Sequence, residues 1–173
     1  MFAGTTIVFD LDGTLVDTAP DLTNALNDVL MRRGHEPVPI EAIRGCVGHG
    51  ARVMIEQSLT RVAARGDVDR MLAEFLAHYE TNIARESRPY PGAFAALDRL
   101  AGQGARLAIC TNKRASLGRL LLQRTLFHRS RRTRHLPRGK AASRPPHRRD
   151  RACRREPVPV GDDRRQRHRS QNS

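Results

Sequence analysis

The chain has few aromatic residues and no long apolar run. Its 173 residues include no tryptophan, two tyrosines and five phenylalanines. No stretch approaches the roughly 18 apolar residues that a membrane-spanning helix requires. We therefore expect no membrane partner, and we expect one modest hydrophobic core.

Cysteine is also scarce. Cys46, Cys110 and Cys153 are spaced neither as disulfide pairs nor as metal ligands. An odd number of cysteines and the lack of a signal peptide favour a reducing, cytoplasmic location. Cys110 falls within an apolar stretch, so we expect it to be a core residue.

Acidic residues become scarce in the last part of the chain. Residues 1–122 hold 14 basic and 14 acidic residues, whereas residues 123–173 hold 17 basic and 4 acidic ones. The whole formal charge of +13 therefore belongs to the C-terminal segment. Such a segment has too few apolar residues to build a core, so we expect residues 123–173 to form an Arg-rich, disordered tail.

This basic tail allows one alternative function, which is binding to nucleic acid. Clustered arginines, such as those in residues 129–134, bind the phosphates of any polyanion. Phe127 is the one aromatic residue of the tail, so stacking on bases is nearly absent. We expect non-specific polyanion binding at most, and no specific nucleic-acid partner.

The first 122 residues alternate between strand-like and helix-like patterns. Residues 5–9 and 106–111 are apolar and predict buried strands. Apolar residues at helical spacing predict helices that begin near Thr18, Ile40, Val53, Asp67, Phe94 and Ala115. Thr18 and Asp21 offer N-cap chemistry for the first of these helices.

The order of these elements predicts an α/β fold with a Rossmann-like parallel sheet as its core. Residues 1–16 supply the first strand and a catalytic loop, and residues 17–88 form an inserted, all-helical cap. Residues 89–122 supply a core helix, a second strand and another helix, so the sheet is expected to be incomplete. Parallel strands place their carboxyl ends at one edge of the sheet, where ligands bind.

Two acids end the first expected strand. Residues 7–18 read IVFDLDGTLVDT, which places Asp10 and Asp12 on the same side of an extended segment. Like charges at the mouth of a buried strand repel each other and are costly to keep. A divalent cation and a phosphoryl substrate are the simplest groups that use such a pair.

This string resembles the first motif of the haloacid dehalogenase superfamily of hydrolases and phosphotransferases. The resemblance implies that Asp10 is a nucleophile that forms an aspartyl-phosphate and that Asp12 is the acid/base. It also implies Mg²⁺, held by the Asp10 carboxylate and the Asp12 backbone carbonyl. Thr111 and Asn112, after the second strand, match the superfamily's second motif, which binds the phosphoryl group.

Four more strings resemble bacterial phosphoglycolate phosphatases. They are DTAPDL at residues 17–22, VGHGAR at residues 47–52, YPG at residues 90–92 and ICTNK at residues 109–113. The resemblance implies hydrolysis of a small phosphorylated metabolite, 2-phosphoglycolate, with a sugar phosphate or a nucleotide as the alternative. It also implies that His49, Gly50 and Arg52 close over a small carboxylate. The alternative is that His49 is a surface loop residue and Arg52 a solvated helix start.

The sequence as written departs from the family in its last part. Lys140 is followed by two alanines where the family has proline, and residues 161–163, Gly-Asp-Asp, lack the later acid that completes a metal site. Codons read one base later can encode the expected family motifs in order. Residues 134–138 give Asp-Thr-Phe-Pro, residues 140–144 give Lys-Pro-His-Pro, and residues 162–170 give a segment containing Gly-Asp-Ser-Ala-Thr-Asp.

These matches indicate that the tail is an out-of-frame translation. One base gained, or two lost, between about Leu122 and Phe127 produces it. The chain as written then lacks the family's lysine, its last metal acid and its remaining strands. We therefore keep an inactive fragment as an alternative to an active phosphatase.

Overall fold

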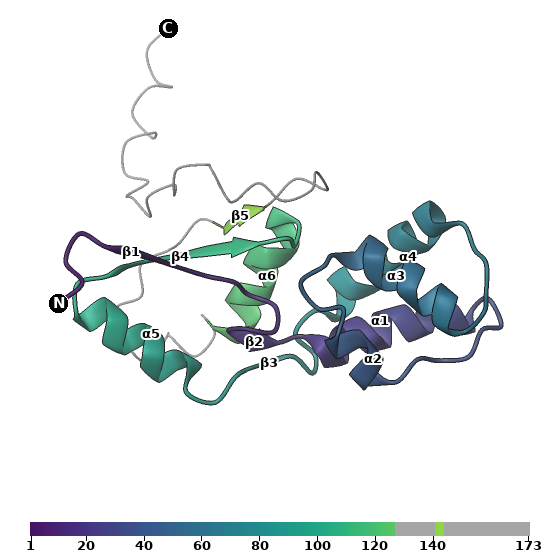
Figure 1. Cartoon of the computed structure of the whole chain (residues 1–173), viewed down its shortest axis with the longest axis horizontal. Coiled ribbons are helices and arrows are strands. Elements are labelled where there is room, and N and C mark those ends of the chain that lie inside the picture. The colour runs from purple at the N-terminus through teal and green to yellow at the C-terminus, as the bar shows by residue number, and fades with distance from the viewer. Residues whose placement is uncertain (127–140, 144–173) are drawn as a thin grey trace, which may run out of the picture.

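The computed structural model describes residues 1–126 and 141–143 of the chain. Figure 1 shows two parts beside each other, a small sheet flanked by helices and a separate group of helices. The helices of the sheet part are α5 (Ala93–Gly102) and α6 (Ala115–Thr125). The expected α/β class is confirmed.

A parallel sheet organises the first part. Its described strands lie in the order β1-β4-β5; they are β1 (Thr6–Phe9), β4 (Arg106–Thr111) and β5 (Ala141–Ser143). β1 and β4 are in parallel register, with Phe9 opposite Ile109. The carboxyl ends of β1 and β4 therefore meet at the same edge of the sheet, as the sequence predicts.

β1 is less buried than its apolar sequence predicts. The side chain of Val8 is 52% exposed. Among the described residues β1 pairs with β4 alone, so it lies at an edge of the sheet. The expectation of a fully buried strand is wrong here, because such burial requires neighbouring strands and covering layers on both faces.

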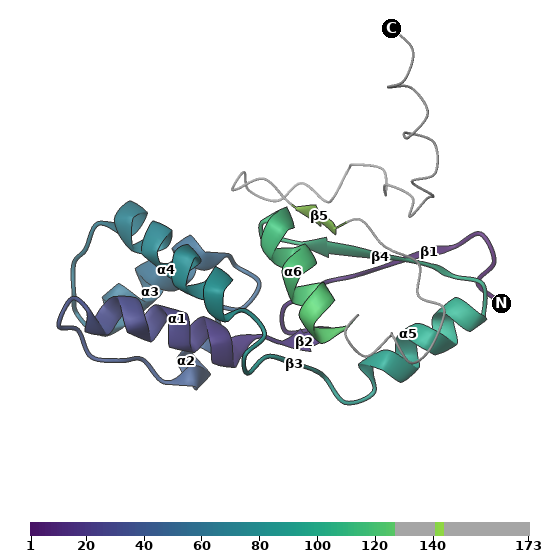
Figure 2. The same cartoon turned by 180° about the vertical axis from the view of Figure 1, so that it is seen from behind.

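Four helices are inserted after β1, and we call residues 19–82 the cap. The chain enters the cap through β2 and leaves it through β3, and these two short strands pair antiparallel as a neck. The bounds are β2 (Val16–Asp17), α1 (Ala19–Met31), α2 (Ile40–Arg44), α3 (Ala51–Arg61), α4 (Val68–Asn82) and β3 (Arg88–Pro89). The view from behind shows α1 to α4 on one side of the neck, with α5 and α6 on the other (Figure 2).

The side chains expected to cap α1 are used elsewhere. Thr18 occupies the N-cap position, but its hydroxyl makes no capping bond and instead donates to Asp12. Asp17 accepts a hydrogen bond from the Ala19 N–H in its place. The capping expectation for Thr18 and Asp21 is therefore wrong, because both side chains have partners outside the helix.

Asp21 joins the entrance of the cap to its exit. Its side chain is 2% exposed and accepts hydrogen bonds from the backbone N–H groups of Glu86 and Ser87, at 2.8 and 2.9 Å. The Ser87 hydroxyl donates to the same carboxylate at 2.5 Å. A buried charge is costly unless it is hydrogen-bonded, so these bonds hold the two crossings of the neck together.

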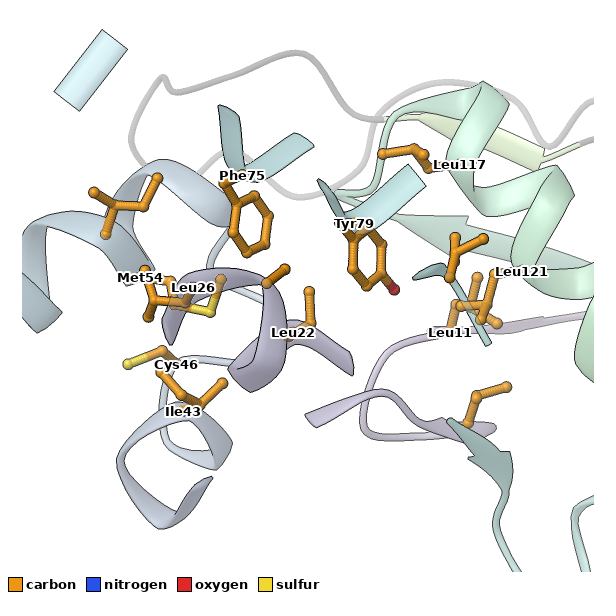
Figure 3. Packing of buried hydrophobic residues seen from close by; sticks show 14 of the residues in the cluster. Leu11, Leu22, Leu26, Ile43, Cys46, Met54, Phe75, Tyr79, Leu117 and Leu121 are labelled. Carbon is orange, nitrogen blue, oxygen red and sulfur yellow. The ribbon is translucent and has the colours of Figure 1, made fainter. Parts of the chain in front are cut away.

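One hydrophobic cluster extends through both parts. The apolar faces expected for α1 and α4 are confirmed; they bury Leu22, Ala25, Leu26, Val29, Leu30, Met71, Phe75 and Tyr79. Figure 3 shows Tyr79 between Phe75 and Leu22 of the cap and Leu121 of α6. The cluster thus includes buried side chains of α4 in the cap and of α6 beside the sheet.

The helix α6 extends beyond the expected start of the tail. It continues through Thr125, and the following Leu126 is 3% exposed. Residues 123–126 thus belong to the packed structure. The prediction of a disordered tail otherwise concerns residues outside the described ones, apart from the short strand β5. No helix in the described ranges combines the length and the apolar character needed to cross a membrane.

The buried face of α1 allows a first prediction. Leu26 is 0% exposed, whereas Met31 of the same helix is 56% exposed. Leu26→Ala is expected to lower the free energy of unfolding by about 2–5 kcal/mol because it leaves a cavity. Met31→Ala is expected to change it by no more than about 0.5 kcal/mol. Urea denaturation measures both, and equal losses would contradict the packing described.

A second prediction concerns the ion pair between Arg33, in the turn after α1, and Glu74 of α4. Arg33 lies 2.7 Å from Glu74, and its hydrogen bond lowers the pKa of Glu74. Glu74 therefore loses its charge at a lower pH in the folded chain than in the unfolded chain. This difference stabilises the fold at pH values above the ordinary carboxyl pKa. The stabilisation is lost as the pH falls through the pKa that Glu74 has in the folded state.

Glu74→Gln is therefore expected to lower the melting temperature at pH 7 and to have a smaller effect at pH 3. Glu80→Gln, an exposed position on the same helix, is the matched control. Thermal melts at both pH values measure the difference. An effect of Glu74→Gln that is equal at the two pH values would show that the ion pair is not its cause.

Candidate functional site

The two acids of the first motif lie in the loop that follows β1. The Leu11 N–H donates to Oδ1 of Asp10 at 2.7 Å, and Leu11 itself is 0% exposed. The buried leucine between the acids anchors the loop in the core. Asp10 is exposed, whereas the side chain of Asp12 is only 9% exposed, so Asp10 is the more accessible of the two acids.

Three side chains surround the carboxylate of Asp12. The Thr18 hydroxyl donates to Oδ1 at 2.8 Å, and Nζ of Lys113 lies 3.1 Å from the same oxygen. The Thr111 hydroxyl donates to Oδ2 at 3.4 Å. Both oxygens of Asp12 therefore have partners from separate segments of the chain.

Thr111 reaches this site because it ends β4. The parallel register places the end of β4 beside the end of β1, and Thr111 is 3% exposed. Its hydroxyl oxygen also accepts the Lys113 N–H at 3.2 Å. The prediction that Asp10, Asp12 and Thr111 share one edge of the sheet agrees with these contacts.

A loop of the cap covers the site. The side-chain amide of Asn112 donates to the Gly48 carbonyl at 2.5 Å. A Cβ built on Gly48 would lie 4.0 Å from Oδ2 of Asp10. The turn at residues 47–50 is thus held over Asp10, and Asn112 contacts the cap in this structure.

The site also contains a buried cation, Lys113. The side chain of Lys113 is 7% exposed, and its Nζ donates to the hydroxyl of Tyr79 at 3.1 Å. The ammonium also lies 4.5 Å from the centre of the Tyr79 ring. Lys113 belongs to the string ICTNK, but nothing local in the sequence pairs it with an aromatic residue of the cap.

The charges of the site influence one another. Burial raises the pKa of Asp10, helped by the charge of Asp12, while the Leu11 N–H and Lys113 act in the opposite direction. Burial disfavours the charged form of Lys113, but Tyr79 and Asp12 outweigh it and raise its pKa. Burial likewise raises the pKa of Tyr79. At neutral pH the site therefore pairs the ammonium of Lys113 with the neutral phenol of Tyr79.

The three cap residues expected to meet a substrate carboxylate are placed differently from one another. His49 is exposed and Gly50 is half-buried; both follow Gly48 in the loop over the site. Arg52 forms ion pairs with Asp69 at the start of α4 and with Glu56, the latter at 4.0 Å. The structure thus brings the loop near Asp10, but it ties the Arg52 side chain to the cap.

The acids offer a minimal place for a divalent cation. No group of three or more His, Cys, Asp or Glu side chains that could hold a metal lies within the described residues. Mg²⁺ is commonly bound through one or two carboxylates, with waters and substrate phosphates as further ligands. Three side chains engage the Asp12 carboxylate, so the Asp10 carboxylate is the more accessible of the two for such an ion.

Comparison with known proteins identifies the family of the chain. A family model described as haloacid dehalogenase-like hydrolase matches residues 7–128. The phosphoglycolate phosphatase of Caulobacter vibrioides is 43% identical over 122 residues, which cover 69% of this chain and 52% of that protein. The phosphoglycolate phosphatase of Mesorhizobium japonicum is 51% identical over 110 residues, which cover 62% of this chain and 48% of that protein.

The chain spans about half the length of these curated relatives. A crystal structure from Haemophilus somnus, described as a predicted phosphoglycolate phosphatase, is similar with a TM-score of 0.62 at 26% identity. The similarity covers 69% of this chain and 56% of that one. The fold class expected from the sequence and the resemblance to this family are both confirmed.

Close packing between the loop after β1 and the cap allows a prediction. Gly13 has a φ of +75°, and a Cβ built there would lie 3.2 Å from Cγ1 of Val47. A residue with a Cβ pays roughly 1–2 kcal/mol in this left-handed region. Gly13→Ala is therefore expected to lower the free energy of unfolding by at least that amount, measured by urea denaturation.

Two variants separate the causes of that loss. Val47→Ala removes the contacting methyl, so the double variant is expected to cost less than the sum of the two single changes. Gly102→Ala is the control, since nothing lies within 4 Å of a Cβ at that position. An equal loss at Gly102 would contradict the explanation given for Gly13.

Proposed function

Since the chain belongs to the haloacid dehalogenase-like hydrolase family, we propose that its site hydrolyses a phosphate monoester through an aspartyl-phosphate on Asp10. The observation that carries the proposal is the convergence of Thr18, Lys113 and Thr111 on Asp12, beside the accessible Asp10. Phosphate esters hydrolyse very slowly in water, so a positioned nucleophile and compensation of charge supply most of the rate.

Asp10 and Asp12 divide the proton and phosphoryl transfers between them. A carboxylate oxygen of Asp10 attacks phosphorus, and the bond from phosphorus to the ester oxygen breaks. Asp12 must carry a proton when the substrate reacts; it gives this proton to the leaving oxygen. As a carboxylate it then takes a proton from the water that attacks the aspartyl-phosphate. Phosphate leaves, and both side chains return to their initial states.

Thr111 and Asn112 are proposed to hold the phosphoryl group. The Thr111 hydroxyl lies at the end of β4 within reach of Asp12, and the Asn112 amide points to the cap loop over the site. Backbone N–H groups after the two strands supply further donors to an anion. Binding of the phosphoryl group would require Asn112 to exchange its present partner, the Gly48 carbonyl.

Mg²⁺ is proposed as the cofactor, held by the Asp10 carboxylate and the Asp12 backbone carbonyl. When bound, it would neutralise charge on the phosphoryl oxygens and relieve the repulsion between the two acids and the substrate. The residues described here supply the remaining functions, which are orientation of the nucleophile and proton transfer.

The proposed substrate is 2-phosphoglycolate. Relatives at 43% and 51% identity are named phosphoglycolate phosphatases, and the cap loop at residues 47–50 lies over Asp10. His49 and Gly50 are placed where a small carboxylate beside the phosphoryl group would meet the cap. Arg52 would have to leave Asp69 to join them. A sugar phosphate or a nucleotide is the alternative, because the cap sets the choice.

We also propose that the chain changes reading frame between about Leu122 and Phe127. The family match ends at residue 128, and the relatives are matched over about half their length. The sequence beyond that point lacks the lysine and the last acid that the family carries, while a shifted frame can encode both. The chain as written is then expected to turn over its substrate slowly.

The activity is tested on the full chain with 2-phosphoglycolate and with p-nitrophenyl phosphate. Phosphate release is expected to require Mg²⁺ and to fall to the level of the enzyme-free control in Asp10→Asn, because the amide is a much weaker nucleophile. Asp98→Asn, an exposed acid of α5, is the matched control and is expected to retain activity. Release that persists in Asp10→Asn would overturn the proposed site.

The reading frame is tested by sequencing the coding DNA across codons 118–130. Loss of one base, or gain of two, relative to the present reading is expected and would restore the frame. A confirmed present reading would overturn the frame proposal. The product of the restored frame is then compared with the present chain for phosphate release. Release by the restored product alone would show that the altered C-terminal segment causes the loss of activity.

A further inference from the structure

Lys113 is a buried cation that takes no part in the proton and phosphoryl transfers of the proposed reaction. Its side chain is 7% exposed, although a lysine side chain is rarely buried without partners. The backbone N–H of Lys113 bonds to Thr111, which fixes where the side chain leaves the end of β4. The ammonium is thereby directed between the sheet and the cap.

The two partners of Lys113 belong to different parts of the structure. Oδ1 of Asp12, 3.1 Å away, is in the loop after β1. The hydroxyl of Tyr79, also 3.1 Å away, is near the end of α4 in the cap. A lysine ammonium has three donors and no acceptor, so one group can hold both oxygens at once. Figure 3 shows the Tyr79 hydroxyl directed away from the cap, toward Leu11 and Leu121.

Asp12 is thus connected to both ends of the cap. Thr18, at the start of α1, donates to Asp12 directly, and Tyr79, near the end of α4, reaches it through Lys113. Tyr79 is itself fixed, because it is 1% exposed and stacks on Phe75 with ring centres 5.9 Å apart. A displacement of α4 would therefore move the partner of the ammonium that holds Asp12.

We propose that Lys113 is a positioning residue that couples the orientation of the Asp12 carboxylate to the position of the cap through Tyr79. The consequence for the reaction rests on the proposed function, in which Asp12 is the acid/base. The bridge itself rests on the two contacts of the ammonium. Small displacements of a catalytic group reduce the rate strongly while leaving substrate binding nearly intact.

The kinetic test compares variants of the full chain with 2-phosphoglycolate as substrate. Lys113→Met and Tyr79→Phe are each expected to lower kcat by about tenfold or more, with KM changed less than about twofold. Lys113→Arg, which keeps the charge and the donors, is expected to recover part of kcat. Arg119→Met, an exposed cation of α6, is the control and is expected to leave kcat unchanged. A rise in KM with unchanged kcat would overturn the proposal.

The double variant tests whether Lys113 and Tyr79 act through one another. If they form one bridge, Tyr79→Phe has no further effect on kcat once Lys113 is methionine. Independent structural roles would give effects that multiply, and that result would contradict the bridge.

Amide hydrogen exchange tests the bridge without any activity. Tyr79→Phe is expected to speed exchange at residues 11–18, which include the loop of Asp12 and the neck, and to do so only when Lys113 is present. Equal exchange in both backgrounds, or no change at all, would overturn the bridge. If the exchange result holds while neither the unaltered chain nor the frame-restored product releases phosphate, the proposed function fails and the bridge stands.

Discussion

The repulsion between two carboxylates, Asp10 and Asp12, is the constraint around which the described structure is arranged. A turn after β1 brings both acids to one edge of the sheet, where Leu11 anchors the loop and donates its N–H to Asp10. Asp12 is held by Thr18, Lys113 and Thr111. Hydrogen-bond donors and one ammonium thus offset charge that would otherwise destabilise the loop.

The groups that hold Asp12 also join the two parts of the molecule. Thr18 lies where the chain enters the cap, at the start of α1. Lys113 contacts Tyr79, which lies near the end of α4, where the chain leaves the cap. Asp21 closes the neck between the two crossings, and one hydrophobic cluster continues from α4 to α6. Because these contacts share residues, the position of the cap and the geometry of the acids are not independent properties of this fold.

Local patterns in the sequence predicted the elements and the strand ends correctly, but not the contacts between distant segments. The spacing of apolar residues located α1, α4, β1 and β4. Because parallel strands have their carboxyl ends at one edge of the sheet, the sequence also placed Asp10, Asp12 and Thr111 together. The neck was missed because two-residue strands carry no periodic signal. The partners of Lys113 were missed because Tyr79 reads as an ordinary apolar position of α4. The sequence did not decide whether Arg52 contacts a substrate carboxylate or is a solvated residue at a helix start. Its ion pair with Asp69 depends on how α3 packs against α4, which local patterns do not specify.

The central claim is that Asp10 accepts the phosphoryl group. The most direct measurement incubates the full chain with Mg²⁺ and ³²P-labelled substrate, quenches with acid and maps the label by peptide mass spectrometry. The account predicts an acid-stable, base-labile phosphate on Asp10. Label on another residue, or no label while phosphate is released, would contradict it.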